Sequence, residues 1–330
     1  MNQPPVLLTM GDACGIGPEI VAKAFVQDGG TDLCVVGDAE LMQRELGASM
    51  PVARLASPMD LAPPHCLPVW QPVDLPKGLL ELPRGLIDAR AGLAAARCVS
   101  AAVRAIQQGE GRAMVTAPIH KEALHAAGIA HPGHTEMLQE LAAQGSGVLR
   151  PVRMMLANEE LRVVLVTIHC SLRQAVEQVS FESVLQTIRI ADAALRRFGL
   201  VRPRIAVSGL NPHAGEGGLF GSEEIDHIEP AIKAARGDGV DARGPFAPDT
   251  VFMRARKGEF DAVIAMTHDQ GLIPVKYLGV ENGVNVTLGL PFVRTSPDHG
   301  TAFDIAGKGR ADANSMLAAI RMARRLAQAQ

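Results

Sequence analysis

The sequence predicts an α/β fold of two α/β/α lobes with mostly parallel sheets and an active-site cleft between them. Short runs of aliphatic and β-branched residues alternate with longer segments in which apolar residues recur at helical spacing, as in strand–helix–strand units. The chain has 330 residues, more than one hydrophobic core usually serves, so two lobes are expected.

The first half of the chain separates its elements clearly. The apolar run at 6–10 ends at Gly11, and Pro18 stands where the first turn of a helix tolerates a missing N–H. The proline-rich region 58–76 predicts an irregular surface segment that contains one short strand. We expect strands at 6–10, 33–36 and 113–116, and helices at 18–27, 39–46 and 89–108.

In the second half, the helix expected at 181–198 has the strongest signals. Ser180 can cap its start, and Gly199 stands just past its end. The remaining expected elements are strands at 162–168, 204–208, 261–266 and 284–288, and a final helix at 314–328.

Composition and charge exclude several classes of partner. The formal net charge is −3 and aromatic residues make up 3% of the chain. Nucleic acid would therefore find no basic stripe for its phosphates and few aromatic rings for its bases to stack on. The N-terminus lacks the basic segment of a signal peptide, and the apolar run at 163–168 is too short to cross a bilayer. Five cysteines without a C-x-x-C pair fit reduced thiols. We therefore expect a soluble cytoplasmic protein that binds neither nucleic acid nor membrane.

Three histidines follow expected strands: His169, His213 and His268. Ligands of open α/β sheets bind beyond the carboxyl ends of the strands, and three imidazoles with an open position suit a catalytic divalent metal. The glycines of NPHAGEGGLFG would let the backbone fold tightly around such a site. An isolated histidine at a strand end is more often structural, so spacing alone leaves both interpretations open. Imidazole ligands favour zinc, cobalt or manganese over magnesium.

The tetrad GHTE at 133–136 opens an expected helix. Its backbone N–H groups and the Thr135 hydroxyl could hold an anion at the helix N-terminus, next to His134. The simpler alternative is an ordinary helix cap formed by Thr135.

Three further polar residues stand in apolar, glycine-containing segments: Lys276, Asn285 and Arg294. Cationic side chains in such settings bind carboxylate or phosphate, arginine often through two parallel hydrogen bonds. The alternative is a surface charge whose stem lies along apolar neighbours.

The usual nucleotide fingerprints are absent. A G-x-G-x-x-G pattern from Gly15 would need glycine where Ile20 stands, and Gly307-Lys308 is followed by Gly309 instead of serine or threonine. The remaining candidate is the segment 298–309, DHGTAFDIAGKG, whose small and polar residues could wrap an adenosine.

Seven motifs follow one another in a familiar order: GDACGIGPEI, TAPIHKEAL, GHTEML, NPHAGEGGLFG, GPFAPDTVF, THDQG and DHGTAFDIAGKG. With them the chain resembles the 4-hydroxythreonine-4-phosphate dehydrogenase (PdxA) family of vitamin B6 synthesis over nearly its whole length. GIGPE and HGTAFDIAGKG are also similar to segments of isocitrate and isopropylmalate dehydrogenases, which implies their fold.

The resemblance implies a homodimer whose active site is completed by the partner subunit. It also implies NAD or NADP and one divalent metal per site, which could be zinc, cobalt, manganese or magnesium. His169, His213 and His268 match the family's metal ligands, one of which reaches across the dimer. By analogy with the isocitrate relatives, the first lobe would span 1–130 plus 296–330 and the second 131–295.

The other site residues are likewise implied by the resemblance. Lys276, Asp249 and Asp269 would be catalytic, Lys276 either holding an anionic group or relaying a proton. The substrate-binding residues would be His134, Thr135, Lys276, Asn285 and Arg294. The cofactor-binding residues would be His299, Gly300, Thr301, Ala302 and Asp304.

The implied activity is oxidation of a secondary alcohol of a small anionic substrate: 4-phosphohydroxy-L-threonine, with decarboxylation to follow. Catabolic members of the family act on D-threonate or erythronate 4-phosphate, or on aromatic cis-dihydrodiols of the terephthalate type. These catabolic substrates remain alternatives because Ala13-Cys14 and Ser171 replace residues that are usual in the family. A metal-dependent phosphohydrolase and a non-enzymatic metal- or sugar-phosphate-binding protein are more distant alternatives.

Overall fold

The structure is a computed structural model that describes residues 3–131, 133–144, 147–279 and 282–328. It divides into two compact units: Met1–Arg150 with Leu290–Ala327, and Pro151–Gly289 with Gln328–Gln330. We call them the first and second unit. The lobes expected at 1–130 plus 296–330 and at 131–295 stay a prediction; residues 131–150 and 290–295 lie in the first unit.

The sheet of the first unit is parallel throughout its described strands, which run in the order β3-β4-β2-β1-β5-β12. The chain leaves β1 toward β2 on one side and later returns to β5 on the other. This reversal creates a topological switch point between β1 and β5, where open α/β sheets bind ligands. The strands are β1 (Val6–Thr9), β2 (Leu33–Val36), β3 (Val52–Leu55), β4 (Leu67–Trp70), β5 (Ala113–Thr116) and β12 (Val293–Pro297).

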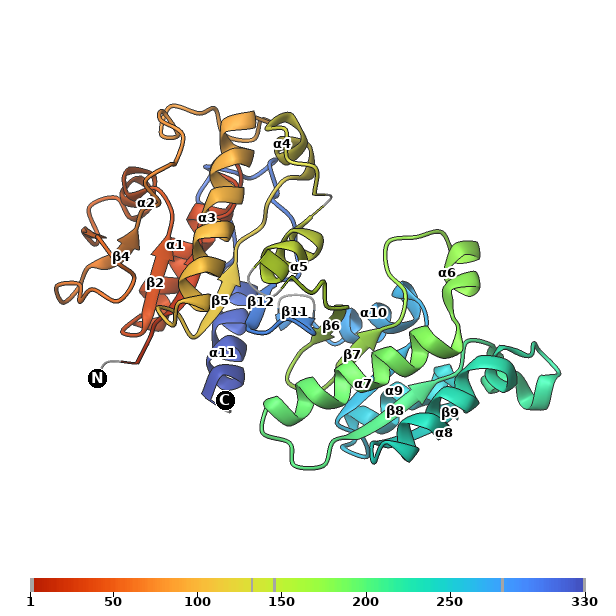
Figure 1. Cartoon of the computed structure of the whole chain (residues 1–330). Helices are drawn as coiled ribbons and strands as arrows, with labels where there is room; N and C mark the ends of the chain where they lie inside the picture. The colour runs from red at the N-terminus through yellow and green to blue at the C-terminus, as the bar shows by residue number, and fades with distance from the viewer. Residues whose placement is uncertain (1–2, 132, 145–146, 280–281, 329–330) are drawn as a thin grey trace. The chain divides into compact units, whose positions relative to one another are not determined.

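Helices cover this sheet. The alanine-rich α3 packs against β1, β2 and β5 (Figure 1). On β12, Thr295 donates a hydrogen bond to the carbonyl oxygen of Ala319 in α11. The helices are α1 (Gly17–Asp28), α2 (Ala39–Leu46), α3 (Ala89–Gln107), α4 (Lys121–Ala126), α5 (His134–Gln144) and α11 (Asn314–Gln328).

The sheet of the second unit has the order β11-β6-β7-β10-β8-β9 among its described strands. It is mixed, because β6 pairs antiparallel with both β11 and β7, whereas β7, β10, β8 and β9 are parallel. The strands are β6 (Arg153–Ala157), β7 (Arg162–Leu165), β8 (Arg204–Ser208), β9 (Asp241–Phe246), β10 (Ala262–Ala265) and β11 (Val284–Leu288).

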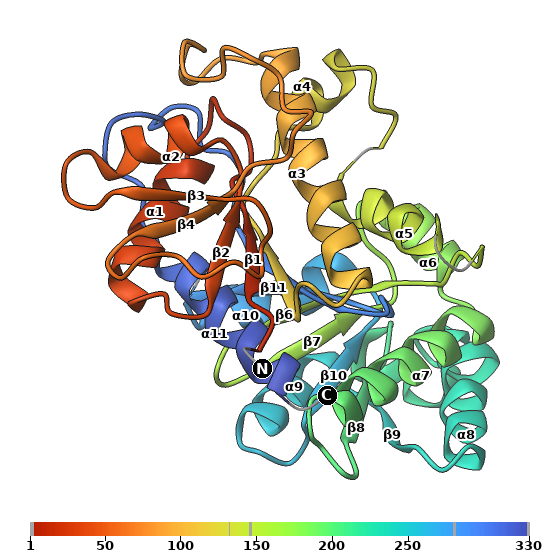
Figure 2. The same ribbon diagram turned by 60° about the vertical axis from the view of Figure 1, so that its left-hand side comes forward.

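Figure 2 shows α7 and α8 on one face of this sheet and α9 and α10 on the other. Alternate residues of β7 face α9 and α10, and Val163 and Leu165 meet Phe252 and Leu272 there in a buried apolar core. The helical elements are α6 (Leu172–Gln178), α7 (Phe181–Arg197), η1 (Pro212–Gly218), η2 (Glu224–Ile228), α8 (Glu229–Gly237), α9 (Pro248–Arg256) and α10 (His268–Tyr277).

The α/β class and the mostly parallel pairing are confirmed. Ser180 caps α7 as predicted, since its side chain accepts a hydrogen bond from the backbone N–H of Ser183. The strand expected at 162–168 ends at Leu165, three residues early. Within the part of the chain that the structure describes, no helix combines the length and apolar character needed to cross a membrane.

Candidate active site

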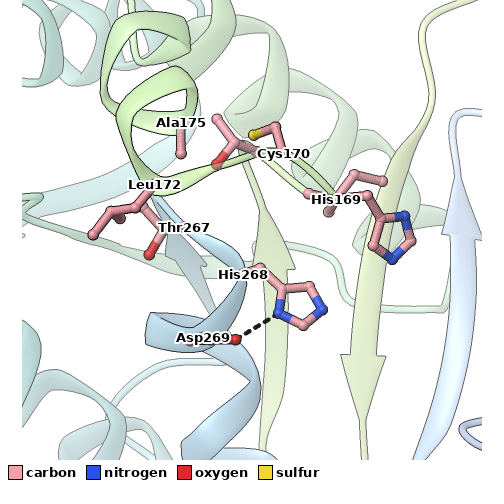
Figure 3. A pocket seen from close by; sticks show the side chains of 9 residues that line it. His169, Cys170, Leu172, Ala175, Thr267, His268 and Asp269 are labelled. Carbon is pink, nitrogen blue, oxygen red and sulfur yellow. Dashed lines mark hydrogen bonds and ion pairs between the residues drawn. The ribbon is translucent and has the colours of Figure 1, made fainter.

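Two of the predicted metal ligands meet in the second unit. His169 and His268 follow β7 and β10, which are neighbours in the sheet, and Thr167 Oγ1 ties the strand ends by donating to the carbonyl oxygen of Met266 at 2.8 Å. The two imidazole rings lie 5.8 Å apart between centroids, tilted by 45°. They line a cavity of about 330 Å³, which we call the histidine pocket (Figure 3). Its other lining residues are Thr167, Ile168, Cys170, Leu172, Ala175, Thr267 and Asp269.

Asp269 fixes the His268 ring within this pocket. The Nδ1 atom of His268 lies 2.8 Å from Asp269 Oδ1 (Figure 3). A carboxylate that accepts from Nδ1 selects the tautomer in which Nε2 has a lone pair for a ligand. Asp269 therefore stands here as an orienting group for an imidazole.

His213 does not line the histidine pocket. It is exposed on η1, where its ring contacts Phe220 at 6.2 Å between centroids. Among the residues that the structure describes, no three His, Cys, Asp or Glu side chains are placed to hold one metal ion. The chain therefore brings two of the three predicted ligands together.

A buried carboxylate, unpredicted from the sequence, orders the loop that carries His213. Glu224 is 1% exposed and accepts hydrogen bonds from the backbone N–H groups of Leu210 and Asn211, at 2.7 and 2.8 Å. A Cβ at Gly215 would lie 2.6 Å from Glu224 Oε2, so only glycine fits there. Gln270 joins this loop to β10, because it accepts from Met266 N and donates to the Gly209 carbonyl oxygen.

Backbone strain concentrates at these loops. His169 and His213 both adopt the left-handed conformation, with φ of 36° and 53°. Non-glycine residues rarely adopt it, and such residues cluster at functional sites. In the described part of the chain, five of the six non-glycine residues with positive φ lie in predicted site segments: His169, His213, Ala214, Glu216 and Ala302.

The first unit contains a second cluster of polar side chains, Arg294, Thr116 and His134; we name this cluster the anion pocket after the role proposed for it below. Arg294 on β12 is only 3% exposed, and its Nη2 and Nε donate to Thr116 Oγ1 at 2.7 and 3.2 Å. Burial lowers the pKa of Arg294 to about 10, so the group stays cationic at neutral pH. The alternative of a surface charge is therefore wrong for Arg294.

His134 is the first residue of α5, and its buried Nε2 has no hydrogen-bond partner. Burial, and then the charge of Arg294, hold the pKa of His134 well below its usual range. A neutral imidazole beside a buried guanidinium can accept an anion, here at the positive end of a helix. Thr135 lies inside the first turn of α5, so the alternative of an N-cap at Thr135 is wrong.

The other predicted substrate and catalytic residues belong to the second unit. Lys276 on α10 and Asn285 on β11 are half-buried, and Asp249 is exposed in the first turn of α9.

The predicted cofactor segment, which we call the 298–309 loop, connects β12 to α11 in the first unit. Thr301 accepts a hydrogen bond from the Ile16 N–H at 3.0 Å through its carbonyl oxygen. The ring of Phe303 stacks on His120 at 4.7 Å, and His299 Nδ1 lies 3.1 Å from the Gly300 carbonyl oxygen. Ala302 is half-buried, whereas Gly300 and Asp304 are exposed. The loop borders the switch point between β1 and β5.

The two departures from the family pattern have local explanations. Cys14 is fully buried, and burial is the main cause that raises the pKa of its thiol to about 12, so it is an inert core group. Ser171 caps α6 by accepting from Gln174 N, while the Gln174 side chain accepts from Ser171 N. All five cysteines carry free thiols.

A family model described as pyridoxal phosphate biosynthetic protein PdxA matches residues 30–323. The chain belongs to the PdxA family. A 4-hydroxythreonine-4-phosphate dehydrogenase of Beijerinckia indica is 53% identical over 98% of this chain and 95% of its own length. A D-threonate 4-phosphate dehydrogenase of Salmonella typhimurium is 46% identical over 99% and 100%. The crystal structure of a 4-hydroxythreonine-4-phosphate dehydrogenase from Klebsiella pneumoniae, 44% identical, superposes with a TM-score of 0.90 over 99% and 98% of the two chains.

These relatives confirm the family resemblance and the enzyme class expected from the sequence. This PdxA-family chain is an oxidoreductase, a dehydrogenase that acts on a hydroxyl group.

Proposed function

We propose that the chain oxidises the secondary alcohol of 4-phosphohydroxy-L-threonine with NAD⁺ or NADP⁺, and that the β-keto acid formed then loses CO₂. The observation that carries this is the 53% identity to a 4-hydroxythreonine-4-phosphate dehydrogenase over almost the entire chain. The anion pocket supports it, because a buried arginine with an oriented guanidinium suits a phosphate group.

A divalent metal fits the donor set of the second unit. His268 keeps Nε2 available, and His169 shares its pocket, so both would hold zinc, cobalt, manganese or magnesium. We propose that His213 of the partner subunit completes the set, since this chain's own His213 does not line the pocket. When bound, the metal would act as a Lewis acid that lowers the pKa of the substrate hydroxyl.

The homodimer that this requires has support in the surface of the second unit. Large apolar side chains near the His213 and His268 elements are exposed: Leu219, Phe220, Ile225, Met253, Ile273 and Tyr277. Tyr277 is 90% exposed and Leu219 72%. We propose that a second copy covers them, because η1 contacts both η2 and α9, and exposed apolar side chains on adjoining elements mark association surfaces.

In this proposal, the anion pocket holds the phosphate through Arg294 and His134, with Thr135 beside them. Lys276 and Asn285 are proposed as further substrate-binding residues, as the family resemblance implies, and Lys276 would either hold an anionic group or relay a proton. Asp249 is proposed as a second catalytic carboxylate. The cofactor contacts would be His299, Gly300, Thr301, Ala302 and Asp304.

A substrate panel tests the proposal. The enzyme is supplied with Mn²⁺ or Zn²⁺ and NAD⁺ or NADP⁺, and reduction of the dinucleotide is followed by its absorbance. The panel contains 4-phosphohydroxy-L-threonine, D-threonate and D-erythronate 4-phosphate, and a terephthalate-type dihydrodiol. We expect the highest kcat/KM with the first compound, and phosphate release without dinucleotide reduction would contradict the assignment.

D-threonate 4-phosphate is the second candidate substrate. The 46% identity to a D-threonate 4-phosphate dehydrogenase favours it. The anion pocket would serve equally, because the two compounds share the phosphate and differ at the amino-bearing carbon. A higher kcat/KM for D-threonate 4-phosphate would assign the chain to this catabolic role.

A further inference from the structure

The 298–309 loop has almost no regular structure of its own. Between the end of β12 at Pro297 and the start of α11 at Asn314, its backbone forms short local turns, such as the one in which Ile305 N donates to the Ala302 carbonyl oxygen. A long irregular segment keeps one conformation only where other elements fix it, because ordering each residue costs conformational entropy.

An ion pair on α1 holds the far end of this loop. Lys23 Nζ donates to the carbonyl oxygens of Gly309 and Ala311 at 2.9 and 2.7 Å, and to Glu19 Oε1 at 2.8 Å. Glu19 Oε1 also accepts from the Ala311 N–H at 2.9 Å. Three donors of the ammonium group are thereby engaged, and the loop is bound through both a carbonyl and an amide of Ala311.

Burial makes this contact strong. The Glu19 side chain is only 7% exposed, so water competes little for its carboxylate, whereas the Lys23 side chain is 34% exposed. At the near end of the loop, the Ile16 N–H holds the Thr301 carbonyl oxygen. A Cβ at Gly15 would stand 3.0 Å from Thr301 Cβ, so a larger residue there would crowd the loop. The segment 302–308 thus has an anchor on each side, at Ile16 and at the Glu19–Lys23 pair, and the Phe303–His120 stack adds a contact between them.

We infer that Glu19 and Lys23 are positioning residues for the dinucleotide: they hold the 298–309 loop in its binding conformation before the cofactor arrives. The inference rests on the proposed function, in which this loop holds the nucleotide. A loop fixed in advance binds its ligand without a further loss of conformational entropy at that step. Glu19 and Lys23 act through the loop, since Glu19 Oε1 and Lys23 Nζ bind each other and the backbone of 309–311.

The test compares Lys23→Met and Glu19→Gln with the unaltered enzyme. Methionine keeps the aliphatic stem and loses the three hydrogen bonds, whereas glutamine keeps an acceptor for Ala311 N and loses the charge. We expect the Kd for NAD⁺ or NADP⁺ to rise about tenfold, equivalent to about 1.4 kcal/mol. The KM for the phosphorylated substrate and the kcat at saturating dinucleotide should stay within about twofold. Amide hydrogen exchange across 299–311 in the free enzyme should accelerate.

Glu40→Gln is the matched control, because Glu40 pairs with Arg54 on the surface of the same unit at 3.0 Å. It should change neither exchange nor affinity. Faster loop exchange with unchanged dinucleotide affinity would overturn the inference, as would unchanged exchange in both variants. If the unaltered enzyme binds neither dinucleotide, the proposed function fails first and the inference falls with it. A loss confined to the variants leaves the proposed function standing.

Discussion

The anion pocket of the first unit and the histidine pocket of the second differ in burial and in how their side chains are held. Arg294 is buried, hydrogen-bonded to Thr116 and placed beside a neutral imidazole, so the pocket is formed within one chain before a ligand binds. His169 and His213 are exposed on strained backbone, and the chain gathers only two of the three proposed metal ligands. In the first unit, a buried cation is fixed by side-chain hydrogen bonds without a ligand. In the second unit, the backbone conformation positions imidazoles that are proposed to share a metal ion.

The largest effect is expected at the histidine pocket. His268→Ala should remove one of the proposed metal ligands and lower kcat by about a thousandfold or more. Bound metal is measured by elemental analysis alongside turnover. Cys170→Ala, which changes another lining residue, should alter kcat by less than about threefold. Full metal content and turnover in His268→Ala would show that this pocket is not the metal site.

Arg294→Met tests the anion pocket. If this buried guanidinium binds the phosphate as proposed, its loss should raise the KM of the phosphorylated substrate by about a hundredfold, since a hydrogen bond to a charged group contributes about 1.5–3 kcal/mol. Arg294→Lys should recover part of this loss, because lysine restores the charge without the planar fork. Equal KM values for Arg294→Met and the unaltered enzyme would show that the phosphate does not bind at Arg294.

Glu224→Gln probes how far loop order matters to the histidine residues. Glutamine cannot accept all the hydrogen bonds that Leu210 and Asn211 now donate to the carboxylate. Turnover should fall about tenfold, the lower range for residues that orient metal ligands. Glu223→Gln, which can still accept from Asn211 Nδ2, is the control and should stay near full activity. Similar losses in both variants would contradict a special role for Glu224.

The smallest effect concerns pH and stability. Because the pKa of folded His134 lies well below 6.5, the unfolded chain binds an extra proton as the pH falls through 6.5. His134 therefore destabilises the fold at acid pH, and the loss grows from about pH 6.5 downward until the folded pKa is reached. His134→Asn should flatten this part of the Tm–pH curve by a few degrees. An unchanged slope between pH 6.5 and 5 would show that His134 is not buried as a neutral ring.

Local patterns predicted the regular elements well where apolar periodicity was strong. The strands at 33–36, 113–116, 204–208 and 284–288 agree with the structure residue for residue. β9 and β12 were not predicted, because DARGPF contains a Gly-Pro pair and VRTSP buries arginine, threonine and serine where an apolar run would be the usual signal. β3 and β6 were also not predicted; β6 contains the short apolar run MMLA, which by periodicity alone fits a strand or part of a helix.

The site was predictable in its residue types and less so in its organisation. Strand ends pointed to His169, His213 and His268, yet nothing local separates His213 from the other two. The roles of Glu224 and Thr116 depend on contacts with residues 13 and 178 positions away, which no short window contains. Glu19 lies in the GDACGIGPEI motif, but its partner Ala311 is 292 positions away in the sequence.

β12 belongs to the first unit but is synthesised after nearly all of the second. The second unit is almost continuous along the chain, from Pro151 to Gly289, whereas the first unit draws on both ends of the polypeptide. Arg294 is synthesised only after nearly nine-tenths of the protein. β5 of the first unit therefore lacks its neighbour β12 until nearly all of the second unit has been synthesised. Nascent chains cut short before that point contain the histidines of the second unit and lack the buried Arg294 of the first.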